Sequence, residues 1–409
     1  MLQIHPGDNT VRLCPGGEMM FSQKLLKQTS LPALLLDLDA LDKNCQDIAA
    51  KANGKTIRIA TKSIRSIPVI KRILASSPVF QGVMSFSPHE AIFLAEKGIH
   101  DILIGYPCWD SAALRKIARL NLLDYQITLM IDSKDQLPLL EKIAAETNGL
   151  FYLCMDIDMS TTFAGFHFGV RRSPIKNEED ALQLAKAIQQ SSNLELIGVM
   201  GYEAQIAGVG DQVPQQQLKN RLVSFLKKQS IHRIHQRRES VVKTLMKNGF
   251  SISLVNGGGT GSLHTTSKEE LVTEVTAGSG FYAPLLFDYY KDFHYQPSLF
   301  FALPIVRKPT PQIHTCLGGG YIASGAIGKD KEPKPVFPPG GKLLNLEGAG
   351  EVQTPVFYEK EKLRIGDAIV FRAAKAGEIC ERFNDIICLS DNKIVDQYKT
   401  YRGEGVSFL

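Results

Sequence analysis

Short apolar runs alternate along the chain with longer stretches in which apolar residues recur at helical spacing. Each apolar run is short enough for one buried strand and ends in a polar or glycine-containing loop. Eight such runs occupy residues 57–62, 82–87, 101–106, 126–132, 151–158, 196–203, 253–259 and 272–280. Helix-like stretches such as 89–99 lie between them. Continuous apolar strands that alternate with helices are typical of a parallel sheet covered on both faces, so the pattern predicts an α/β fold.

Eight strand-helix units favour a (β/α)8 TIM barrel over a six-stranded open sheet. The pattern changes near residue 296, after which proline and glycine are frequent. Short strands with tight turns are predicted over 363–371, 385–390 and 393–400. We therefore expect a barrel domain over 30–295 and a C-terminal β-domain over 296–409, to which residues 1–29 could contribute. The apolar segment 32–41 precedes the first barrel strand and could pair with the β-domain.

Composition and charge exclude several classes of partner. The formal net charge of +5 on 409 residues is too small to indicate nucleic acid or a membrane surface, so we expect a small anionic or zwitterionic ligand. The N-terminus lacks the cationic start and apolar stretch of a signal peptide, and no apolar run approaches the roughly 20 residues that span a bilayer. These features predict a cytoplasmic protein without a membrane partner.

The cysteines are scattered, odd in number and without a C-x-x-C pair, which argues against a disulfide framework or a zinc ribbon. They are Cys14, Cys45, Cys108, Cys154, Cys316, Cys380 and Cys388. We expect them to be reduced core residues. A basic stretch over 216–248 predicts a long helix, either a docking surface or, as surface composition favours, a solvated outer helix of the barrel.

Lys62 ends the first of the eight strands. Burial lowers the pKa of a lysine and turns its free amine into a nucleophile for aldehydes, although a lysine at a strand end can also extend into solvent without any chemical role. In a barrel the chemistry lies at the C-terminal ends of the strands, so the position of Lys62 makes it a candidate catalytic residue.

Two glycine-rich turns follow the last two strands. The first, NGGGTGS (256–262), has glycines that let backbone N–H groups close around a phosphate, and Thr260 and Ser262 add hydroxyls. The second, AGSGFY (277–282), follows one strand later, and loops after strands seven and eight are a recurrent phosphate site in barrels. A lysine and a phosphate site on one face suggest an aldehyde-bearing phosphorylated cofactor, for which pyridoxal phosphate is the natural candidate.

RIATKSIRS (58–66) resembles the cofactor-lysine segment of the D-threonine aldolase and D-serine dehydratase family, in which an arginine stands four residues before the lysine. Arg58, Lys62 and Arg65 match that pattern. Segments 257–261 and 278–290 are similar to the phosphate-binding segments of the family, and 371–384 with 400–405 resemble its C-terminal β-domain. The chain thus resembles the alanine racemase-like, fold type III pyridoxal-phosphate enzymes.

The resemblance implies a Schiff base at Lys62, which would also act as a base. The residues it implies for cofactor binding are Arg58, Lys62, Tyr202, Gly258, Gly259, Thr260, Gly261, Gly278, Ser279 and Tyr282. Where relatives often continue from the tyrosine to a histidine, this chain has Glu203, Ala204 and Gln205. Tyr202 is either a catalytic residue or a buried structural tyrosine.

The stretch 163–174 (FAGFHFGVRRSP), after Asp156 and Asp158, occupies the place where relatives have a charged partner for the ring hydroxyl of the cofactor. His167, Arg171 or Arg172 could fill that role, unless each is an exposed charge or part of a salt bridge. Because the ordinary pKa of histidine is near neutrality, His167 is the better candidate for a second proton carrier.

Relatives bind a divalent metal through a His-x-Cys pair in the C-terminal domain, and this chain departs from that pattern. The corresponding loop is Arg372-Ala373-Ala374-Lys375, which offers neither ligand type. Our hypothesis is that Lys375 supplies a fixed positive charge that orients the hydroxyl or carboxylate of the substrate, so that no metal is needed. The alternative is a surface lysine beside an altered or inactive site.

The sequence therefore predicts a pyridoxal-phosphate-dependent lyase, a homodimer as the resemblance implies, that cleaves a D-3-hydroxy amino acid by a retro-aldol reaction. β-Elimination, as in D-serine dehydratase, and amino acid racemisation are the alternatives within the family. A non-catalytic pyridoxal-phosphate carrier is the alternative of another class, and the added domain over 296–409 distinguishes this chain from such small carriers.

Overall fold

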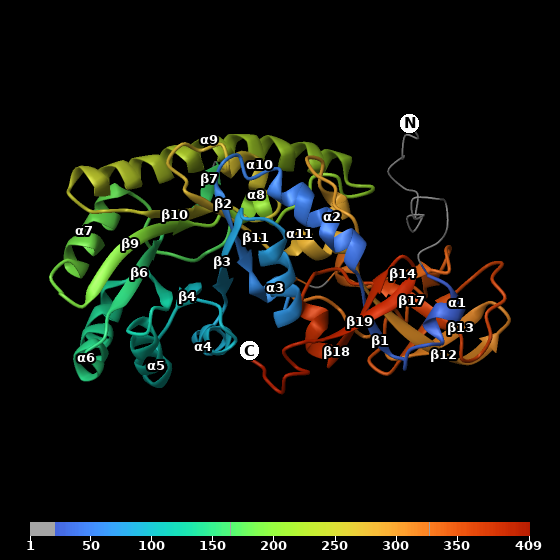
Figure 1. Ribbon diagram of the computed structural model, residues 1–409. Helices are drawn as coiled ribbons and strands as arrows, with labels where there is room; N and C mark the ends of the chain where they lie inside the picture. Colours follow the sequence, from blue (N-terminus) through green and yellow to red (C-terminus); the bar gives the residue numbers. More distant parts are fainter. Residues whose placement is uncertain (1–20, 164, 327) are drawn as a thin grey trace.

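The computed structural model describes residues 21–163, 165–326 and 328–409, which form a barrel domain and a second, β-rich domain beside it (Figure 1). Eight parallel strands close the barrel. They are β2 (Thr56–Ala60), β3 (Phe80–Ser85), β4 (Asp101–Pro107), β5 (Gln126–Ile131), β6 (Phe151–Asp156), β9 (Leu194–Gly201), β10 (Leu254–Gly257) and β11 (Glu274–Ala277). Each of the eight predicted runs overlaps one strand, and β11 pairs with β2 to complete the circle, which confirms the (β/α)8 barrel.

Helices surround the strands. The longer ones are α2 (Leu38–Ala49), α3 (Ile67–Ser76), α4 (Pro88–Glu96), α5 (Ser111–Asn121), α6 (Leu137–Thr147), α7 (Glu178–Ile188) and α9 (Gln217–Lys247). Single turns follow several strands: η1 (Thr61–Ser63), η2 (Lys134–Gln136), α8 (Ala204–Ala207), α10 (Leu263–Thr266), α11 (Ser279–Tyr282) and η3 (Leu285–Tyr289). Side-chain caps fix where helices begin: Ser87 accepts from the N–H of Glu90, and Asp110 caps α5 in the same way.

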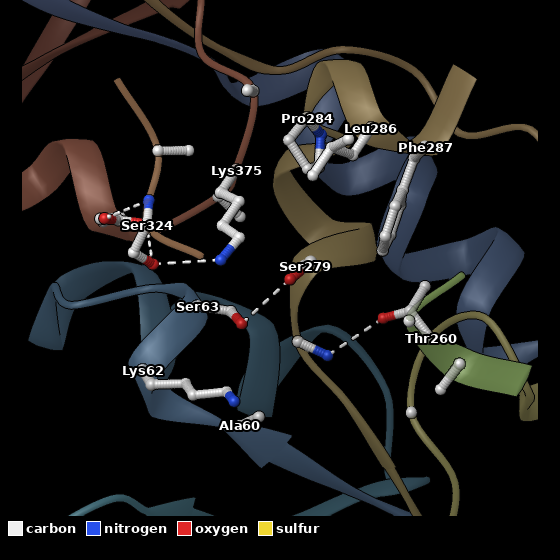
Figure 2. Close-up of a pocket in the computed structure, with 18 of the residues that line it drawn as sticks. Ala60, Lys62, Ser63, Thr260, Ser279, Pro284, Leu286, Phe287, Ser324 and Lys375 are labelled. Atoms are coloured by element: carbon white, nitrogen blue, oxygen red, sulfur yellow. Dashed lines mark hydrogen bonds between the residues drawn. The ribbon is translucent and has the colours of Figure 1, made fainter. Parts of the chain in front are cut away.

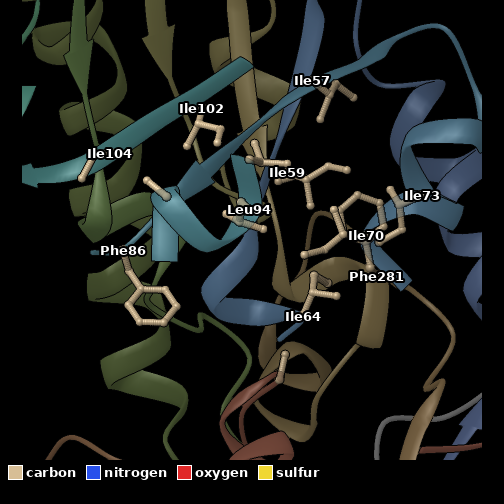
Figure 3. Close-up of a cluster of buried hydrophobic side chains, with 14 of the residues drawn as sticks. Ile57, Ile59, Ile64, Ile70, Ile73, Phe86, Leu94, Ile102, Ile104 and Phe281 are labelled. Atoms are coloured by element: carbon tan, nitrogen blue, oxygen red, sulfur yellow. The ribbon is translucent and has the colours of Figure 1, made fainter. Parts of the chain in front are cut away.

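The main core lies between the barrel strands and the helices. Ile57 and Ile59 of β2 are buried together with Ile70 and Ile73 of α3, and Phe281 closes the cluster from the neighbouring segment (Figure 3). This packing fixes β2, and therefore also the position of the lysine-bearing turn that follows it.

The second domain is built on a nine-stranded sheet whose main path has the order β15-β16-β13-β12-β1-β18-β19, with β17 paired to β12 and β14. The strands are β1 (Ala33–Asp37), β12 (Leu299–Thr310), β13 (Ile313–Leu317), β14 (Lys334–Phe337), β15 (Lys342–Leu343), β16 (Gln353–Phe357), β17 (Ala368–Arg372), β18 (Asp385–Ser390) and β19 (Lys393–Lys399). The short 3-10 helices η4 (Lys329–Lys331) and η5 (Glu378–Arg382) lie in its loops.

The first described residues, from Phe21 to β1, belong to this second domain. β1 runs antiparallel to β12 and parallel to β18, as anticipated for segment 32–41, so the barrel domain begins only at α2. The helix α1 (Gln23–Leu26) adds buried leucines to the core of the same sheet, where Phe21 contacts Phe300 and Phe337. Residues 1–20 lie outside the described part of the chain.

Six cysteines are described, and all six are buried free thiols, as predicted; Cys14 lies outside the described residues. The predicted helix over 216–248 is α9, which runs along the barrel (Figure 1). Two of its cations are not on a solvated face: Lys227 pairs with Asp211, and Arg238 is fully buried. Among the helices that the structure describes, none has the length and apolar character needed to cross a membrane.

Candidate active site

A large cavity of about 1430 Å³ lies at the C-terminal ends of the barrel strands, where the second domain meets the barrel. The barrel contributes the turn after β2, the ends of β3, β4 and β9, and the loops after β10 and β11. The second domain contributes residues from 321–324, 329–331 and 373–382, together with Arg402, Ser407 and Leu409 near the end of the chain. The volume is ample for a ring-bearing cofactor together with a small substrate.

Lys62 lies in η1, directly after β2, and its side chain lines this cavity (Figure 2). Among the described residues, its Nζ has no hydrogen-bond or ion-pair partner. The turn is held from behind, because Arg65 donates from Nε to the carbonyl of Lys62 (3.1 Å) and pairs with Glu381 (2.8 Å). The geometry thus presents an unpaired primary amine on a fixed backbone.

The two glycine turns meet beside that amine. Thr260 Oγ1 accepts the N–H groups of Gly278 (3.3 Å) and Gly280 (3.1 Å), and the hydroxyls of Ser63 and Ser279 lie 3.1 Å apart (Figure 2). A Cβ on Gly278 would lie 2.9 Å from both Ala60 Cβ and Ser63 Oγ. The second glycine turn can therefore approach the lysine-bearing turn this closely only with glycine at position 278.

The first glycine turn is held differently from the sequence-based expectation. Gly258 and Gly259 line the cavity, but the N–H of Gly258 donates to Glu203 Oε2 (3.1 Å) and the N–H of Gly259 donates to Ser262 Oγ (3.1 Å). The backbone donors expected to face a phosphate are thus engaged within the protein. Thr260, whose N–H has no partner among the described residues, is the next donor along the loop.

On the opposite wall, Tyr202 at the end of β9 and Arg172 line the cavity together. The guanidinium of Arg172 lies 4.8 Å from the ring centre of Tyr106 and 5.8 Å from that of Tyr202, and its Nη2 donates to the carbonyl of Gly105 (2.7 Å). Burial raises the pKa of Tyr202 to about 12, so its hydroxyl is protonated at neutral pH.

Arg172 is also close to Asp156 at the end of β6, with Nε 3.4 Å from Oδ2. Burial raises the pKa of Asp156 to about 7, and the nearby Arg172 opposes that rise. Of the three cations weighed for this wall, Arg172 reaches the cavity, whereas Arg171 is exposed and neither it nor His167 lines the cavity.

Lys375 enters the cavity from the second domain, on the side facing Lys62 (Figure 2). Its Nζ donates to Ser324 Oγ (3.0 Å), which also hydrogen-bonds Glu378. Burial lowers the pKa of Lys375, Glu378 opposes this change, and the positive charges of Lys331 and Lys62 lower it further. The site therefore holds a second amine that loses its proton more readily than an ordinary lysine.

Four of the predicted site residues lie away from the cavity lining: Arg58, His167, Gly261 and Tyr282. Arg58 projects toward the opposite end of the barrel, where it forms ion pairs with Glu274 (2.6 Å) and Asp101 (2.7 Å) at the starts of their strands. Its position in the middle of β2 explains this, since only the residues at the strand end face the cavity.

Local contacts explain why Tyr282, His167 and Gly261 do not line the cavity. Tyr282 donates from its hydroxyl to the carbonyl of Ile64 (3.1 Å), so it supports the lysine-bearing turn from outside the cavity. His167 lies on β8 (Phe166–Phe168), which pairs only with β7 (Thr161–Phe163) in a small hairpin that carries it away from the other candidates. A Cβ on Gly261 would lie 2.5 Å from the carbonyl oxygen of Ala207, so this glycine serves close packing.

No group of three or more His, Cys, Asp or Glu side chains suited to a metal ion occurs within residues 21–163, 165–326 and 328–409. Ala373 and Lys375 line the cavity at the place where the resemblance puts a metal-binding pair. That the protein uses no metal stays a prediction.

Sequence reasoning passed over the residues that hold the site from outside, above all Glu203, Arg238 and Glu269. One available signal was Glu203 itself, a carboxylate directly after an apolar strand. Asn256 and Thr276, which line the cavity near its floor and hydrogen-bond each other, were also missed because both lie inside predicted strands.

The fold and site together define a class: a two-domain protein with an alanine racemase-like barrel and a lysine-bearing cavity at its strand ends. The model of the family described as "Alanine racemase, N-terminal domain" matches residues 36–284, and the chain belongs to that family. It is a family of pyridoxal-phosphate-dependent enzymes.

Two sequence relatives have the same assigned activity. A 3-hydroxy-D-aspartate aldolase from Paracoccus denitrificans (strain Pd 1222) is 25% identical over 250 residues, which are 61% of this chain and 59% of that protein. A second 3-hydroxy-D-aspartate aldolase, from Paracoccus denitrificans, is 27% identical over 251 residues with the same coverage. The matches thus span less than two thirds of the length of these relatives.

Solved structures share the fold over nearly the whole chain. D-threonine aldolase from Filomicrobium marinum has a TM-score of 0.79 at 18% identity, covering 94% of this chain and 97% of its own. D-threo-3-hydroxyaspartate dehydratase from Delftia sp. HT23 has a TM-score of 0.72 at 17% identity, covering 92% and 98%. At these low identities the comparison shows a shared fold alone, and that fold includes the second domain.

Proposed function

We propose that the protein is a pyridoxal-phosphate-dependent lyase that cleaves a D-3-hydroxy amino acid into glycine and an aldehyde. The observation that carries this proposal is the unpaired Nζ of Lys62 beside two glycine turns in one cavity. The aldolase relatives favour the retro-aldol reaction over the other chemistries of the family. D-Stereochemistry rests on those relatives alone.

The cavity fits the cofactor. The second glycine turn packs against the lysine-bearing turn, and the hydroxyls of Ser63, Thr260 and Ser279 lie there beside the N–H of Thr260, which is free of partners within the described residues. This arrangement suits a phosphate group. Lys62 would hold the aldehyde carbon through Nζ. Bound there, pyridoxal phosphate withdraws electrons from the bonds to Cα of a substrate amine and so permits one of them to break.

The remaining residues would position the substrate and move its protons. In the cleavage, the proton of the 3-hydroxyl leaves as the aldehyde carbonyl forms, the electron pair of the Cα–Cβ bond moves to Cα, and Cα is then protonated. The free amine of Lys62 can accept the proton of the 3-hydroxyl and, as the ammonium so formed, return it to Cα. Arg172 is the candidate partner for the ring hydroxyl of the cofactor, and the protonated Tyr202 donates a hydrogen bond on the same side.

Lys375 is proposed to take the place of a metal at the substrate hydroxyl. Its positive charge would orient the hydroxyl or a carboxylate oxygen of the substrate and stabilise the negative charge that develops on the hydroxyl oxygen as its proton leaves. Because this charge takes the role of the metal, the reaction would proceed without a divalent ion.

The test is product analysis with a panel of D- and L-3-hydroxy amino acids, including D-threonine and 3-hydroxy-D-aspartate, with pyridoxal phosphate supplied. Each reaction is run with and without a chelator. Glycine and an aldehyde in both conditions are expected. A keto acid in place of the aldehyde would assign β-elimination instead, and inversion of Cα alone would assign racemisation.

If the protein binds the cofactor but converts none of these substrates, the alternative of a non-catalytic carrier would be favoured. Turnover that a chelator abolishes and zinc or manganese restores would refute the role given to Lys375. We also propose that the protein is a homodimer, as the family resemblance implies; light scattering during gel filtration would refute this by giving the mass of one chain.

A further inference from the structure

Glu203 follows Tyr202 at the end of β9, but the two side chains point to different sides of the backbone. Tyr202 lines the cavity, whereas Glu203 is 1% exposed and points behind the first glycine turn. Its Oε2 accepts the N–H of Gly258 (3.1 Å), and its Oε1 accepts the hydroxyl of Ser262 (3.0 Å). The hydroxyl of Thr266 also donates to Oε1. A single buried carboxylate thus gathers donors from the turn and from the helix α10 that follows it.

These contacts determine the shape of the turn. Glu203 holds Gly258 directly and Gly259 indirectly, because the N–H of Gly259 donates to the same Ser262 hydroxyl that donates to Glu203. Gly258 has φ +85°, a left-handed conformation that the two fixed neighbours maintain. Thr260 follows Gly259 directly, and its N–H, which has no partner among the described residues, is the donor proposed for the phosphate.

Arg238 fixes the carboxylate from the other side. This arginine is 1% exposed on α9, and its Nη2 donates to Glu203 Oε2 (3.0 Å) and to the carbonyl of Gly201 (3.0 Å). Its Nη1 donates to Glu269, which does not touch the glycine turn among the contacts described. Burial raises the pKa of Glu269, and the charge of Arg238 opposes that rise. Glu203 is therefore the one carboxylate of the trio that links the buried arginine to the turn, within the described residues.

We propose that Glu203 is the positioning residue of the phosphate cradle: it fixes Gly258 and Ser262 so that Thr260 faces the phosphate of the cofactor. This inference rests on the proposed function, since it presumes that a phosphorylated cofactor binds in the cavity. It predicts that Glu203 contributes to binding only when the ligand carries a phosphate.

The variant that tests this is Glu203→Gln. Glutamine keeps the shape but offers one acceptor oxygen and an NH2 donor, so either the Gly258 and Arg238 donors or the two hydroxyls lose their acceptor. A second variant, Ser262→Ala, removes only the hydroxyl that joins Glu203 to Gly259. Glu269→Gln is the matched control, because it alters a carboxylate that binds Arg238 but makes no side-chain hydrogen bond to the turn among the described residues.

The measurement is the Kd of the full chain, freed of cofactor, for pyridoxal 5′-phosphate and for pyridoxal, followed by absorbance. For Glu203→Gln we expect the Kd for the phosphorylated ligand to rise about 10-fold or more and the Kd for pyridoxal to stay unchanged. Ser262→Ala should show the same selectivity with a smaller loss, and it decides the question if Glu203→Gln does not fold. Glu269→Gln should retain the wild-type ratio of the two constants.

Equal weakening of both ligands, or no weakening of either, would overturn the inference and leave Glu203 a structural residue. A wild-type chain that binds neither ligand would refute the proposed function itself, and the inference with it. The two failures are therefore distinguishable in one titration.

Discussion

Glu90 provides a quantitative test of how the lysine-bearing turn is anchored. It lies in the first turn of α4, is fully buried, and accepts hydrogen bonds from the N–H of Phe86 (2.8 Å) and the hydroxyl of Tyr401 (2.9 Å). The N–H of Tyr401 in turn donates to the carbonyl of Arg65 (2.9 Å), three residues after Lys62. Glu90 thus connects the C-terminal segment to the start of the candidate site.

Burial raises the pKa of Glu90 from the ordinary 4.5 to about 7, although the N–H of Phe86, the hydroxyl of Tyr401 and the charge of Arg65 all act in the opposite direction. A carboxyl whose pKa is raised on folding adds stability that is fully present below pH 4.5 and is lost as the pH rises through 7. The loss is about 3 kcal/mol for a difference of this size.

Glu90→Gln removes the ionisation while keeping the shape of the side chain. The melting temperature of the variant minus that of the wild type should therefore increase between pH 4.5 and pH 8, by about 4 °C for a chain of this length. The assay is differential scanning calorimetry or fluorimetry of both proteins across that range. Because other titrating groups are common to both proteins, the difference isolates Glu90.

Glu96→Gln, at the exposed end of the same helix, is the matched control for the replacement of a carboxylate of α4 by an amide. A difference for Glu90→Gln that does not change with pH would refute the reasoning, because it would mean that Glu90 has the same pKa in the folded and unfolded chain.

Three further predictions concern the cavity. Lys62→Ala should abolish both turnover and the covalent attachment of pyridoxal phosphate, which borohydride reduction and peptide mass spectrometry would locate at position 62 in the wild type. Lys375→Met should lower kcat by about 100-fold. Lys375→Arg should extend activity to higher pH, because burial lowers the pKa of the wild-type lysine, which therefore loses its positive charge at a lower pH than an ordinary lysine. The profiles of kcat and kcat/KM against pH check both. Gly278→Ala should weaken pyridoxal-phosphate binding in a titration and also lower the melting temperature, since the added Cβ would lie 2.9 Å from Ala60 Cβ and Ser63 Oγ and the packed turns would have to move apart.

The sequence by itself determined the strands of the barrel and the ends at which the site lies. Apolar runs of strand length, separated by helical stretches, are local patterns, and each overlaps a strand of the closed barrel. Lys62, Thr260 and Gly278 could be assigned to one cavity because the ends of parallel strands in a barrel always meet on one face.

Only the tertiary structure decided which side chains line the cavity and which ones support its loops from the protein interior. Arg58 is turned to the opposite end by carboxylates that begin two other strands, and the first strand of the chain joins the second domain. Lys375 reaches the cavity from a separate sheet. Glu203 meets Arg238 and Gly258 across 35 and 55 residues of sequence. The physical reason is that strand and helix periodicity depends on neighbouring residues, whereas ion pairs and hydrogen bonds of buried groups depend on partners that only the closed barrel brings within reach.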